Sequence, residues 1–271
     1  MEKFSVLMSV YYKEKPEYFD LSLKSNITDQ ILKPNEFVLI CDGDLPVETE
    51  KVVSKYQELY PDIFKVYRKE NGGLGKALHF GLLKCSNSLI ARSDSDDICT
   101  PDRFIKQVSF MSENKQIGII SSYIDEFYED YTRPKNTKTL PLTHDKLFKM
   151  AKFRNPLNHM AVIMRKEDII RIGSYRHIPY VEDYELWVRA MINGIKIANY
   201  GEVLVHARTG PGMIQRRGTK KYIKSWHLLN IEMIKAGMIG YITYIRNMIS
   251  ISVFVFIPSK LKELLYNRIL R

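Results

Sequence analysis

The chain has 271 residues, of which 45% are hydrophobic and 27% charged, so an intrinsically disordered protein is excluded and there is material for a large core with an appendage. Three cysteines, Cys41, Cys85 and Cys99, are too few for a disulfide scaffold and indicate a reducing compartment. The formal net charge of +10 predicts an anionic partner. Because residues 2–4 lead directly into a strand-like segment, we expect no signal peptide and a cytoplasmic protein.

The first hundred residues alternate between strand-like and helix-like segments. Apolar runs predict strands at Phe4–Val10, Glu36–Cys41, Phe64–Tyr67 and Leu89–Arg92. Helical patterns lie between them, at Pro16–Ile31, Pro46–Tyr60 and Leu74–Lys84. This alternation predicts an α/β fold in which helices flank a doubly wound, mostly parallel sheet and ligands bind at the carboxyl ends of the strands.

The second half of the chain is less regular. It predicts strands at Ile117–Ser122 and Ala161–Arg165, and helices at Glu182–Asn193 and Tyr222–Lys235. The polar stretch Tyr128–Leu142 contains two prolines and predicts an exposed loop, and the breaker-rich stretch Gly210–Ile214 predicts a mobile segment.

Three carboxylates within four residues, Asp94, Asp96 and Asp97, follow the fourth predicted strand. Thr100 and Pro101 then predict the N-cap and first position of a helix, so the acids lie on a strand-to-helix connection. Like charges this close raise one another's pKa, and a divalent cation would relieve the repulsion. Oxygen ligands favour Mg²⁺ or Mn²⁺ over zinc. A D-x-D motif by itself is most simply interpreted as a solvated acidic turn. Whether these acids form a ligand site therefore depends on the residues at the ends of the other predicted strands.

Polar and aromatic residues also follow the first two predicted strands. Ser9, Tyr11 and Tyr12 close the first strand, where a tyrosine either lies against a nucleobase or belongs to the core. Asp42 ends the second strand, where it is suited to accept the N–H of a uracil ring. These positions predict a nucleotide site only in combination with the acids.

A glycine-rich stretch, Glu70–Ala77, follows the third predicted strand. Glycines let backbone N–H groups approach a phosphate, and a helix N-terminus favours negative charge. The stretch lacks the Gly-Lys-Ser/Thr ending of a Walker loop and the G-x-G-x-x-G spacing of a dinucleotide-binding fold. It therefore predicts either a phosphate contact or a plain turn before a helix.

A second acidic stretch, Val181–Arg189, predicts a helix with Glu182 and Asp183 at its N-terminus. The helix dipole alone stabilises acids at that position, so in isolation the stretch is structural as readily as catalytic.

Basic residues concentrate toward the C-terminus. The apolar run Met248–Ile257 is preceded by Arg216, Arg217, Lys220, Lys221 and Lys224. It is far shorter than the ~20 residues of a membrane-spanning helix, and residues 260–271 then mix Lys and Arg with Leu and Ile. This pattern predicts either an amphipathic segment on an anionic membrane surface or a helix packed on the core. No nucleic-acid-binding motif accompanies the charge, so no nucleic-acid partner is expected.

Together these features resemble glycosyltransferase family 2, and within it the bacterial enzymes that assemble O-antigen, capsule and exopolysaccharide, the amylovoran-type branch. The resemblance covers residues 4–208. Its most specific parts are Ile90–Ile98, Pro101–Phe104, Lys106-Gln107 and Glu182–Trp187.

The resemblance implies the GT-A fold of nucleotide-diphospho-sugar transferases over residues 1–215. Residues 1–100 would be the nucleotide-binding half, 101–215 the acceptor-binding half and 216–271 a helical C-terminal extension. The implied enzyme is an inverting, metal-dependent transferase in surface polysaccharide biosynthesis. It moves a hexose or N-acetylhexosamine from a UDP-sugar to a lipid-linked oligosaccharide at the inner face of the cell membrane, with which it is peripherally associated.

The resemblance also implies roles for residues. Asp183 is the implied general base, with Glu182 beside it. The implied ligands of Mn²⁺ or Mg²⁺ are Asp96, Asp94, Asp97 and His206. The implied donor-binding residues are Ser9, Tyr11, Asp42, Asn71, Gly73, Lys76, Arg92, Asp94 and Ser95.

The chain departs from the family pattern at Cys41, where many members carry an aspartate, at Asp44 and at His79, which affects the detail of donor binding. Three alternatives remain. A glycoside hydrolase also needs two carboxylates, but no nucleotide pocket. A sugar-phosphate nucleotidyltransferase would release pyrophosphate rather than UDP. A catalytically inactive, sugar-nucleotide-binding subunit of an assembly complex would tolerate the loss of the acids that this chain retains.

Overall fold

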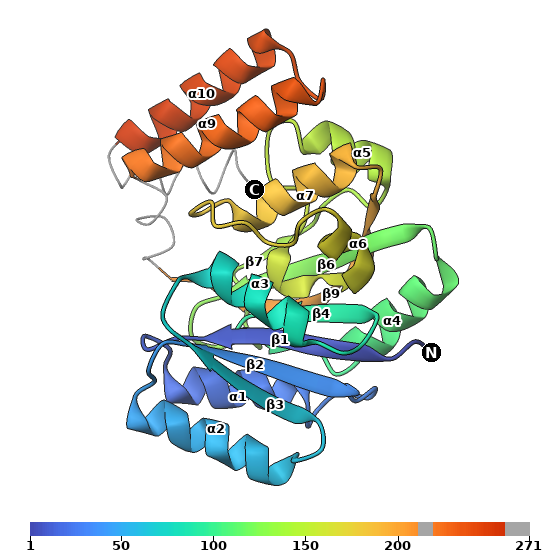
Figure 1. Ribbon diagram of the computed structural model, residues 1–271, viewed down its shortest axis with the longest axis vertical. Helices are drawn as coiled ribbons and strands as arrows, with labels where there is room; N and C mark the ends of the chain where they lie inside the picture. The colour runs from blue at the N-terminus through green and yellow to red at the C-terminus, as the bar shows by residue number, and fades with distance from the viewer. Residues whose placement is uncertain (211–218, 258–271) are drawn as a thin grey trace.

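The computed structural model describes residues 1–210 and 219–257, and a nine-stranded mixed sheet runs through it (Figure 1). The strand order is β3-β2-β1-β4-β8-β6-β9-β5, and β7 pairs with β6. The strands are β1 Phe4–Val10, β2 Glu36–Asp42, β3 Phe64–Lys69, β4 Leu89–Ser93, β5 Ile98–Cys99, β6 Ile117–Phe127, β7 Asn136–Lys138, β8 Ile163–Arg165 and β9 Lys196–Arg208.

The four strands β3, β2, β1 and β4 are parallel, as the first half of the sequence predicts. Val10 lies opposite Cys41, and Met8 lies opposite Ser93. The carboxyl ends of β1, β2 and β4 therefore meet at one edge of the sheet. The residues that follow these strands are brought within reach of one ligand.

The rest of the sheet is mixed. Strand β8 is antiparallel to both of its neighbours, β4 and β6, whereas β6 and β9 pair in parallel. A buried strand reads as a continuous apolar run in either direction, so the sequence pattern carries no signal for this reversal. Strand β6 also runs to Phe127, beyond the predicted Ser122, and β7 lies inside the predicted loop.

Helices cover both faces of the sheet (Figure 1). On one face α1, α2 and α4 supply Phe19, Val53 and Phe104 to a core shared with β1 and β2. On the other face α3, α5, α6 and α7 form a second core, which the C-terminal helices α9 and α10 extend. The helices are α1 Pro16–Asn26, α2 Val47–Leu59, α3 Leu74–Lys84, α4 Arg103–Glu113, α5 His144–Met150, α6 Lys166–Arg171, α7 Glu182–Ile192, α9 Lys220–Lys235 and α10 Tyr241–Phe256, with a 3₁₀ turn, η1, at His159–Ala161.

Two predicted helix boundaries were wrong. Helix α1 ends at Asn26 rather than Ile31, because the Gln30 amide turns back to donate to the carbonyl of Thr100 (2.8 Å). Helix α4 begins at Arg103, and Thr100 is not its N-cap. The Thr100 N–H instead continues the strand pairing by donating to the carbonyl of Leu204 (3.0 Å).

Helices α9 and α10 pack together on the layer that contains α7 (Figure 1). Trp226 and Leu229 of α9, and Ile251 and Phe254 of α10, belong to the core on that side. The predicted packing of this apolar segment on the core is therefore confirmed for one of its faces. Within residues 1–210 and 219–257, no helix is long and apolar enough to cross a membrane.

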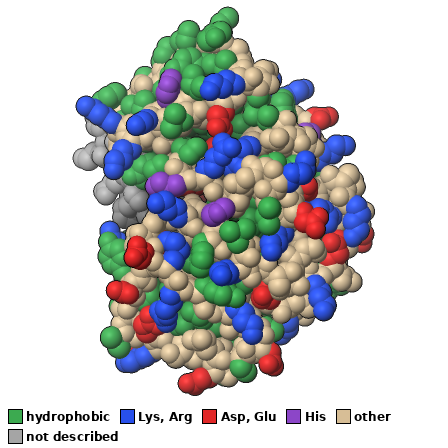
Figure 2. Space-filling view, in the orientation of Figure 1, with side chains coloured by type: hydrophobic (Ala, Val, Ile, Leu, Met, Phe, Trp, Pro, Cys, Tyr) green, Lys and Arg blue, Asp and Glu red, His purple; other side chains and the backbone are tan. Residues whose placement is uncertain are grey.

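The opposite face of α10 is apolar and exposed. It carries Ile242, Ile245, Ile249, Val253 and Phe256, each more than half exposed. Figure 2 shows hydrophobic side chains gathered at this end of the molecule. The remainder of the predicted basic and apolar C-terminus, and most of the predicted mobile segment Gly210–Ile214, lie outside the described residues.

Candidate active site

The acidic loop after β4 is held from two helices. On α1, the Ser22 hydroxyl donates to the carbonyl of Asp94 (2.8 Å), and Asn26 accepts from the hydroxyl of Ser93 (2.7 Å). On α4, the fully buried Arg103 donates to the Ser93 hydroxyl (2.9 Å). These bonds fix the backbone from which the three carboxylates project, so the acids are not a freely solvated turn.

The carboxylates of this loop carry more negative charge than their neighbours neutralise. Burial, followed by the charges of Asp94 and Glu14, raises the pKa of Asp96 to about 7. Burial and the charges of Asp96 and Asp94 raise the pKa of Asp97 well above its ordinary value. One oxygen of Asp97, Oδ2, is buried without a hydrogen-bond partner among the described residues.

This donor set fits a hard divalent cation. Uncompensated, partly buried carboxylates are what Mg²⁺ or Mn²⁺ would stabilise, and such ions commonly take one or two protein carboxylates together with substrate phosphates. Within residues 1–210 and 219–257, no three His, Cys, Asp or Glu side chains are arranged to hold a metal by themselves.

Two arginines adjoin the acids. Arg92 is 2% exposed and pairs with the Asp94 carboxylate, while its Nε and Nη1 have no partner among the described residues. Arg208, at the end of β9, donates its backbone N–H to Asp97 (2.7 Å) and its Nε–H to the carbonyl of Asp96 (3.2 Å). The Ser95 hydroxyl donates a hydrogen bond to the carboxylate of Glu14.

Asp42 organises the glycine-rich loop. Lys69 Nζ lies 2.6 Å from its Oδ1, and the backbone N–H groups of Gly72 and Gly73 donate to its two oxygens (3.0 and 2.9 Å). Asn71 donates to its carbonyl (2.9 Å). The N–H groups expected to approach a phosphate thus bond to Asp42, and the uracil contact of Asp42 and the donor roles of Asn71 and Gly73 stay predictions.

The other predicted donor and metal residues lie around the same edge of the sheet. Tyr11 is 37% exposed and stands edge-to-face with Tyr12, while Ser9 is half-buried and Lys76 exposed. His206 lies opposite Ile98 in the sheet, and its Nδ1 is 3.5 Å from Asp125. Because the carboxylate nearest to His206 belongs to β6 rather than to the acidic loop, its role as a metal ligand stays a prediction without support from its neighbours.

The second acidic pair begins α7. Asp183 accepts a hydrogen bond from the Asn155 amide (2.6 Å). Burial and the adjacent Asp183 raise the pKa of Glu182 to about 7. A Cβ on Gly75 would lie only 3.1 Å from Cγ of Glu182, so the start of α3 packs closely against that side chain. At neutral pH the pair can thus hold a proton on Glu182, next to Asp183.

Asp183 faces a pocket of about 510 Å³ between α7, the residues after α5, and the C-terminal helices. Six of its lining residues are aromatic: Phe153, Tyr180, Tyr184, Tyr222, Trp226 and Phe254. Three are cationic: Lys138, Arg154 and Arg246. A carboxylate at the wall of an aromatic pocket is suited to take a proton from a sugar hydroxyl.

Comparison with known proteins identifies the family. The model of Glycosyl transferase family 2 matches residues 5–177. The chain belongs to glycosyltransferase family 2. The GT-A fold, expected from sequence, is confirmed by solved neighbours: S. aureus TarS with UDP-GlcNAc (TM-score 0.65, 18% identity, 86% of this chain and 66% of that one) and the mannosyltransferase PcManGT of Pyrobaculum calidifontis with GDP-Man and Mn²⁺ (TM-score 0.65, 14% identity, 96% and 72%).

Full-length relatives are enzymes of surface polysaccharides. The amylovoran biosynthesis glycosyltransferase AmsE of Erwinia amylovora is 37% identical over 98% of both chains. The UDP-Gal:alpha-D-GlcNAc-diphosphoundecaprenol beta-1,3-galactosyltransferase of Escherichia coli is 34% identical over 99% of this chain and 97% of its own.

Sequence reasoning missed several residues that build this glycosyltransferase site. Glu185 is completely buried and bonds to Arg189, which donates to the carbonyl of Ser174 (2.7 Å). This ion pair ties α7 to the loop that precedes it. Asn155 and Glu14 were also missed, since each reaches the site from a segment with no periodic pattern.

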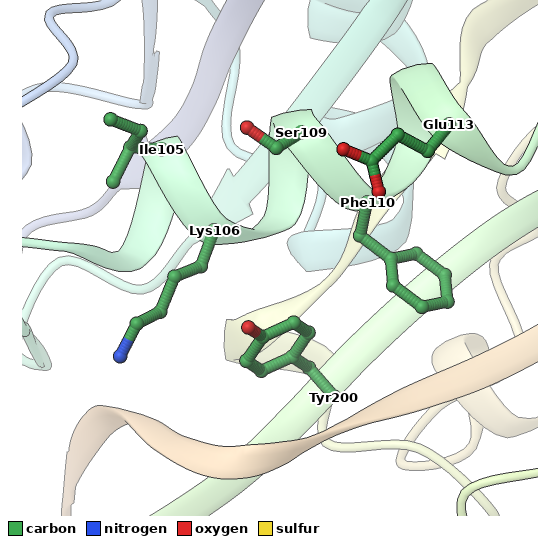
Figure 3. A pocket seen from close by; sticks show the side chains of 6 residues that line it. All are labelled: Ile105, Lys106, Ser109, Phe110, Glu113 and Tyr200. Atoms are coloured by element: carbon green, nitrogen blue, oxygen red, sulfur yellow. The ribbon is translucent and has the colours of Figure 1, made fainter.

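A second hollow of the glycosyltransferase, about 410 Å³, lies over α4 and β9 (Figure 3). Phe110 and Tyr200 stand edge-to-face there, and Lys106 is paired with Asp102 and Glu202. Because its cation is already neutralised, we assign this hollow no ligand.

Proposed function

We propose that this family 2 enzyme is an inverting, metal-dependent transferase that moves a hexose or N-acetylhexosamine from a UDP-sugar to a lipid-linked glycan. The observation that carries the proposal is the position of two distinct acid groups. A charge-rich cluster, Asp94–Asp97, lies at the carboxyl end of β4, and a separate carboxylate, Asp183, faces a pocket suited to an acceptor.

In the proposed reaction, Asp183 accepts the proton of an acceptor hydroxyl while the hydroxyl oxygen forms a bond to the anomeric carbon of the donor sugar. The bond between that carbon and the UDP oxygen breaks, and its electron pair leaves with UDP. Attack from the face opposite the leaving group inverts the anomeric centre. The hydrogen bond from Asn155 orients Asp183, and such a positioned base contributes about 10²–10⁴-fold in rate.

Asp96, with Asp94 and Asp97 beside it, would hold Mn²⁺ or Mg²⁺ together with the diphosphate. The bound ion would stabilise the negative charge that develops on UDP as it leaves. Arg208 anchors the acidic loop and lies where it can contribute positive charge toward the same phosphates. The mannosyltransferase neighbour that binds Mn²⁺ supports this assignment by analogy of fold.

We further propose that the enzyme works at the inner face of the cell membrane. The E. coli relative is named for a diphosphoundecaprenol acceptor, and a lipid of that kind resides in a membrane. The exposed apolar face of α10 and the basic start of α9 are of the kind that bind an anionic lipid surface.

The proposal is tested by measuring UDP release from a panel of UDP-sugars with Mn²⁺, with Mg²⁺ or with EDTA, for wild type, Asp96→Ala and the control Asp102→Ala. Metal-dependent release from one donor, lost only in Asp96→Ala, is expected. Release of pyrophosphate from UTP and a sugar 1-phosphate, without UDP release from any UDP-sugar, would instead identify a nucleotidyltransferase. Absence of both release and UDP binding would refute the proposed transferase.

The stereochemistry needs a separate measurement. From an α-linked donor, NMR of the product is expected to show a β linkage. An α-linked product would refute the single-base mechanism.

A further inference from the structure

The pocket in front of Asp183 has an unusual balance of side chains. Its cations outnumber its single carboxylate by three to one, although it is otherwise lined by aromatic and apolar groups. Aromatic faces suit the apolar faces of a sugar ring, but a neutral sugar has no need of several cations. The excess of positive charge indicates that the ligand carries negative charge next to its sugar.

Two of these cations form no ion pair within the described part of the chain. Among residues 1–210 and 219–257, no carboxylate lies within ion-pair distance of the side chain of Arg154 or Arg246. The Arg246 guanidinium instead stacks on the ring of Phe153, 3.7 Å from its centroid. A stacked guanidinium keeps its N–H donors free at its edge, where they can bond to phosphate oxygens.

Arg246 also occupies a particular place on α10. On one side of it Asn247, Ser250 and Phe254 line the pocket. On its other side Ile245 and Ile249 begin the exposed apolar face. An α-helix places residues three and four apart on the same face, so Arg246 lies at the border between the pocket and the apolar surface.

The backbone at the pocket wall is held in a costly conformation. Tyr180 has a φ of +72°, which is rare for a bulky residue, and its ring stands edge-to-face with Tyr222, 6.2 Å away. Such strain persists where the surrounding structure enforces it, and it is frequent at ligand sites. Here it presents an aromatic ring to the pocket, two residues before the α7 carboxylates.

We infer that this pocket binds a glycosyl diphosphate carried on a long apolar chain, with Arg154 and Arg246 bonding to the diphosphate. The sugar lies among the aromatic rings with a hydroxyl at Asp183, and the apolar chain leaves across the exposed face of α10. This inference rests on the proposed function and extends it by assigning the acceptor's diphosphate to two residues.

The test uses geranyl diphosphate, a soluble compound with the same diphosphate and a short apolar chain, titrated into full-length enzyme. The enzyme is first saturated with UDP and a matching amount of Mn²⁺, so the donor site is blocked. Arg154→Gln and Arg246→Gln are compared with Lys149→Gln, which removes the same charge from the exposed side of α5. UDP affinity is measured for every variant, since an unfolded variant would lose it.

We expect each arginine variant to bind geranyl diphosphate about tenfold more weakly or worse, with UDP affinity and the Lys149→Gln control unchanged. Geraniol, which lacks phosphate, should bind equally weakly to all. If UDP binds but geranyl diphosphate does not, or if the arginine variants bind it as wild type does, the inference fails and the proposed function stands. If the wild-type enzyme does not bind UDP, the proposed function itself is refuted.

Discussion

Glu182 offers a quantitative test of how the start of α7 is built. Its pKa rises from the ordinary 4.5 to about 7, chiefly through burial. Between these two values the unfolded chain ionises at Glu182 while the folded protein keeps the proton. Unfolding then releases a proton, so the folded state loses stability as the pH rises, and the loss is complete above pH 7.

The full pKa shift lowers the free energy of unfolding by about 3.4 kcal/mol, and about 2 kcal/mol of that loss occurs between pH 5.5 and pH 8. Replacing Glu182 by Gln keeps the shape and removes the titration. We therefore expect Glu182→Gln to be more stable than wild type at both pH values. The difference in their free energies of unfolding should be about 2 kcal/mol larger at pH 8 than at pH 5.5. Residual exposure to water makes these values upper bounds.

The assay is urea unfolding at several pH values, with Glu182→Gln and wild type compared at each. Glu167→Gln on α6 is the matched control, since this carboxylate lies away from the site. A difference between Glu182→Gln and wild type that does not change with pH would show that Glu182 ionises freely, and the argument from burial would be refuted. Because the proton lies on Glu182, turnover in this variant should fall by less than about tenfold.

Three further outcomes follow from the structure. Asp183→Asn should lower kcat about 10²–10⁴-fold and leave UDP affinity unchanged, and equal kcat in this variant and wild type would exclude Asp183 as the base. Asn155→Ala should also leave UDP affinity unchanged and should lower kcat by a smaller factor. Glu185→Ala should cost about 3–5 kcal/mol in urea unfolding, because it leaves Arg189 buried without its partner, and a loss below about 1 kcal/mol would contradict that reasoning. Ile249→Lys should weaken cosedimentation with anionic vesicles without changing UDP binding. If this variant cosediments as well as wild type, the exposed face of α10 does not bind the membrane.

The fold of the first hundred residues was predictable because its signals are local. Each parallel strand is an apolar run, each helix between them has a repeating apolar face, and the predicted segment Leu74–Lys84 coincides with α3. The acidic loop was found in the same way, as a run of carboxylates at a strand end. The features that failed, such as the extent of α1 and the N-cap of α4, are decided by bonds to residues about 70 to 100 positions away, Gln30 to Thr100 and Thr100 to Leu204.

The pocket that we propose for the acceptor could not be predicted for a related reason. Its pocket brings together residues from β7, the segment after α5, the start of α7, and α9 and α10. Apart from the start of α7, none of these segments has a sequence motif of its own, and no sequence pattern distinguishes Arg154 or Arg246 from the other basic residues of the chain. Only the packing of α10 on the core, through Asn247 to the carbonyl of Lys152 (2.8 Å), puts the two arginines at one pocket.

The two acid groups differ in what surrounds them, and this difference supports the separate roles that we propose for them. Around Asp96, two further carboxylates and burial raise the cost of ionisation, so the cluster is stabilised by binding a cation. Asp183 has one acidic neighbour, Glu182, whose raised pKa allows it to carry a proton, and a neutral amide donor in Asn155. A metal at Asp183 would have to displace that amide, whereas a metal at Asp96 relieves an existing repulsion. Under the proposed function, the ion would therefore bind with the donor diphosphate at the end of β4, and the proton transfer would take place at the start of α7.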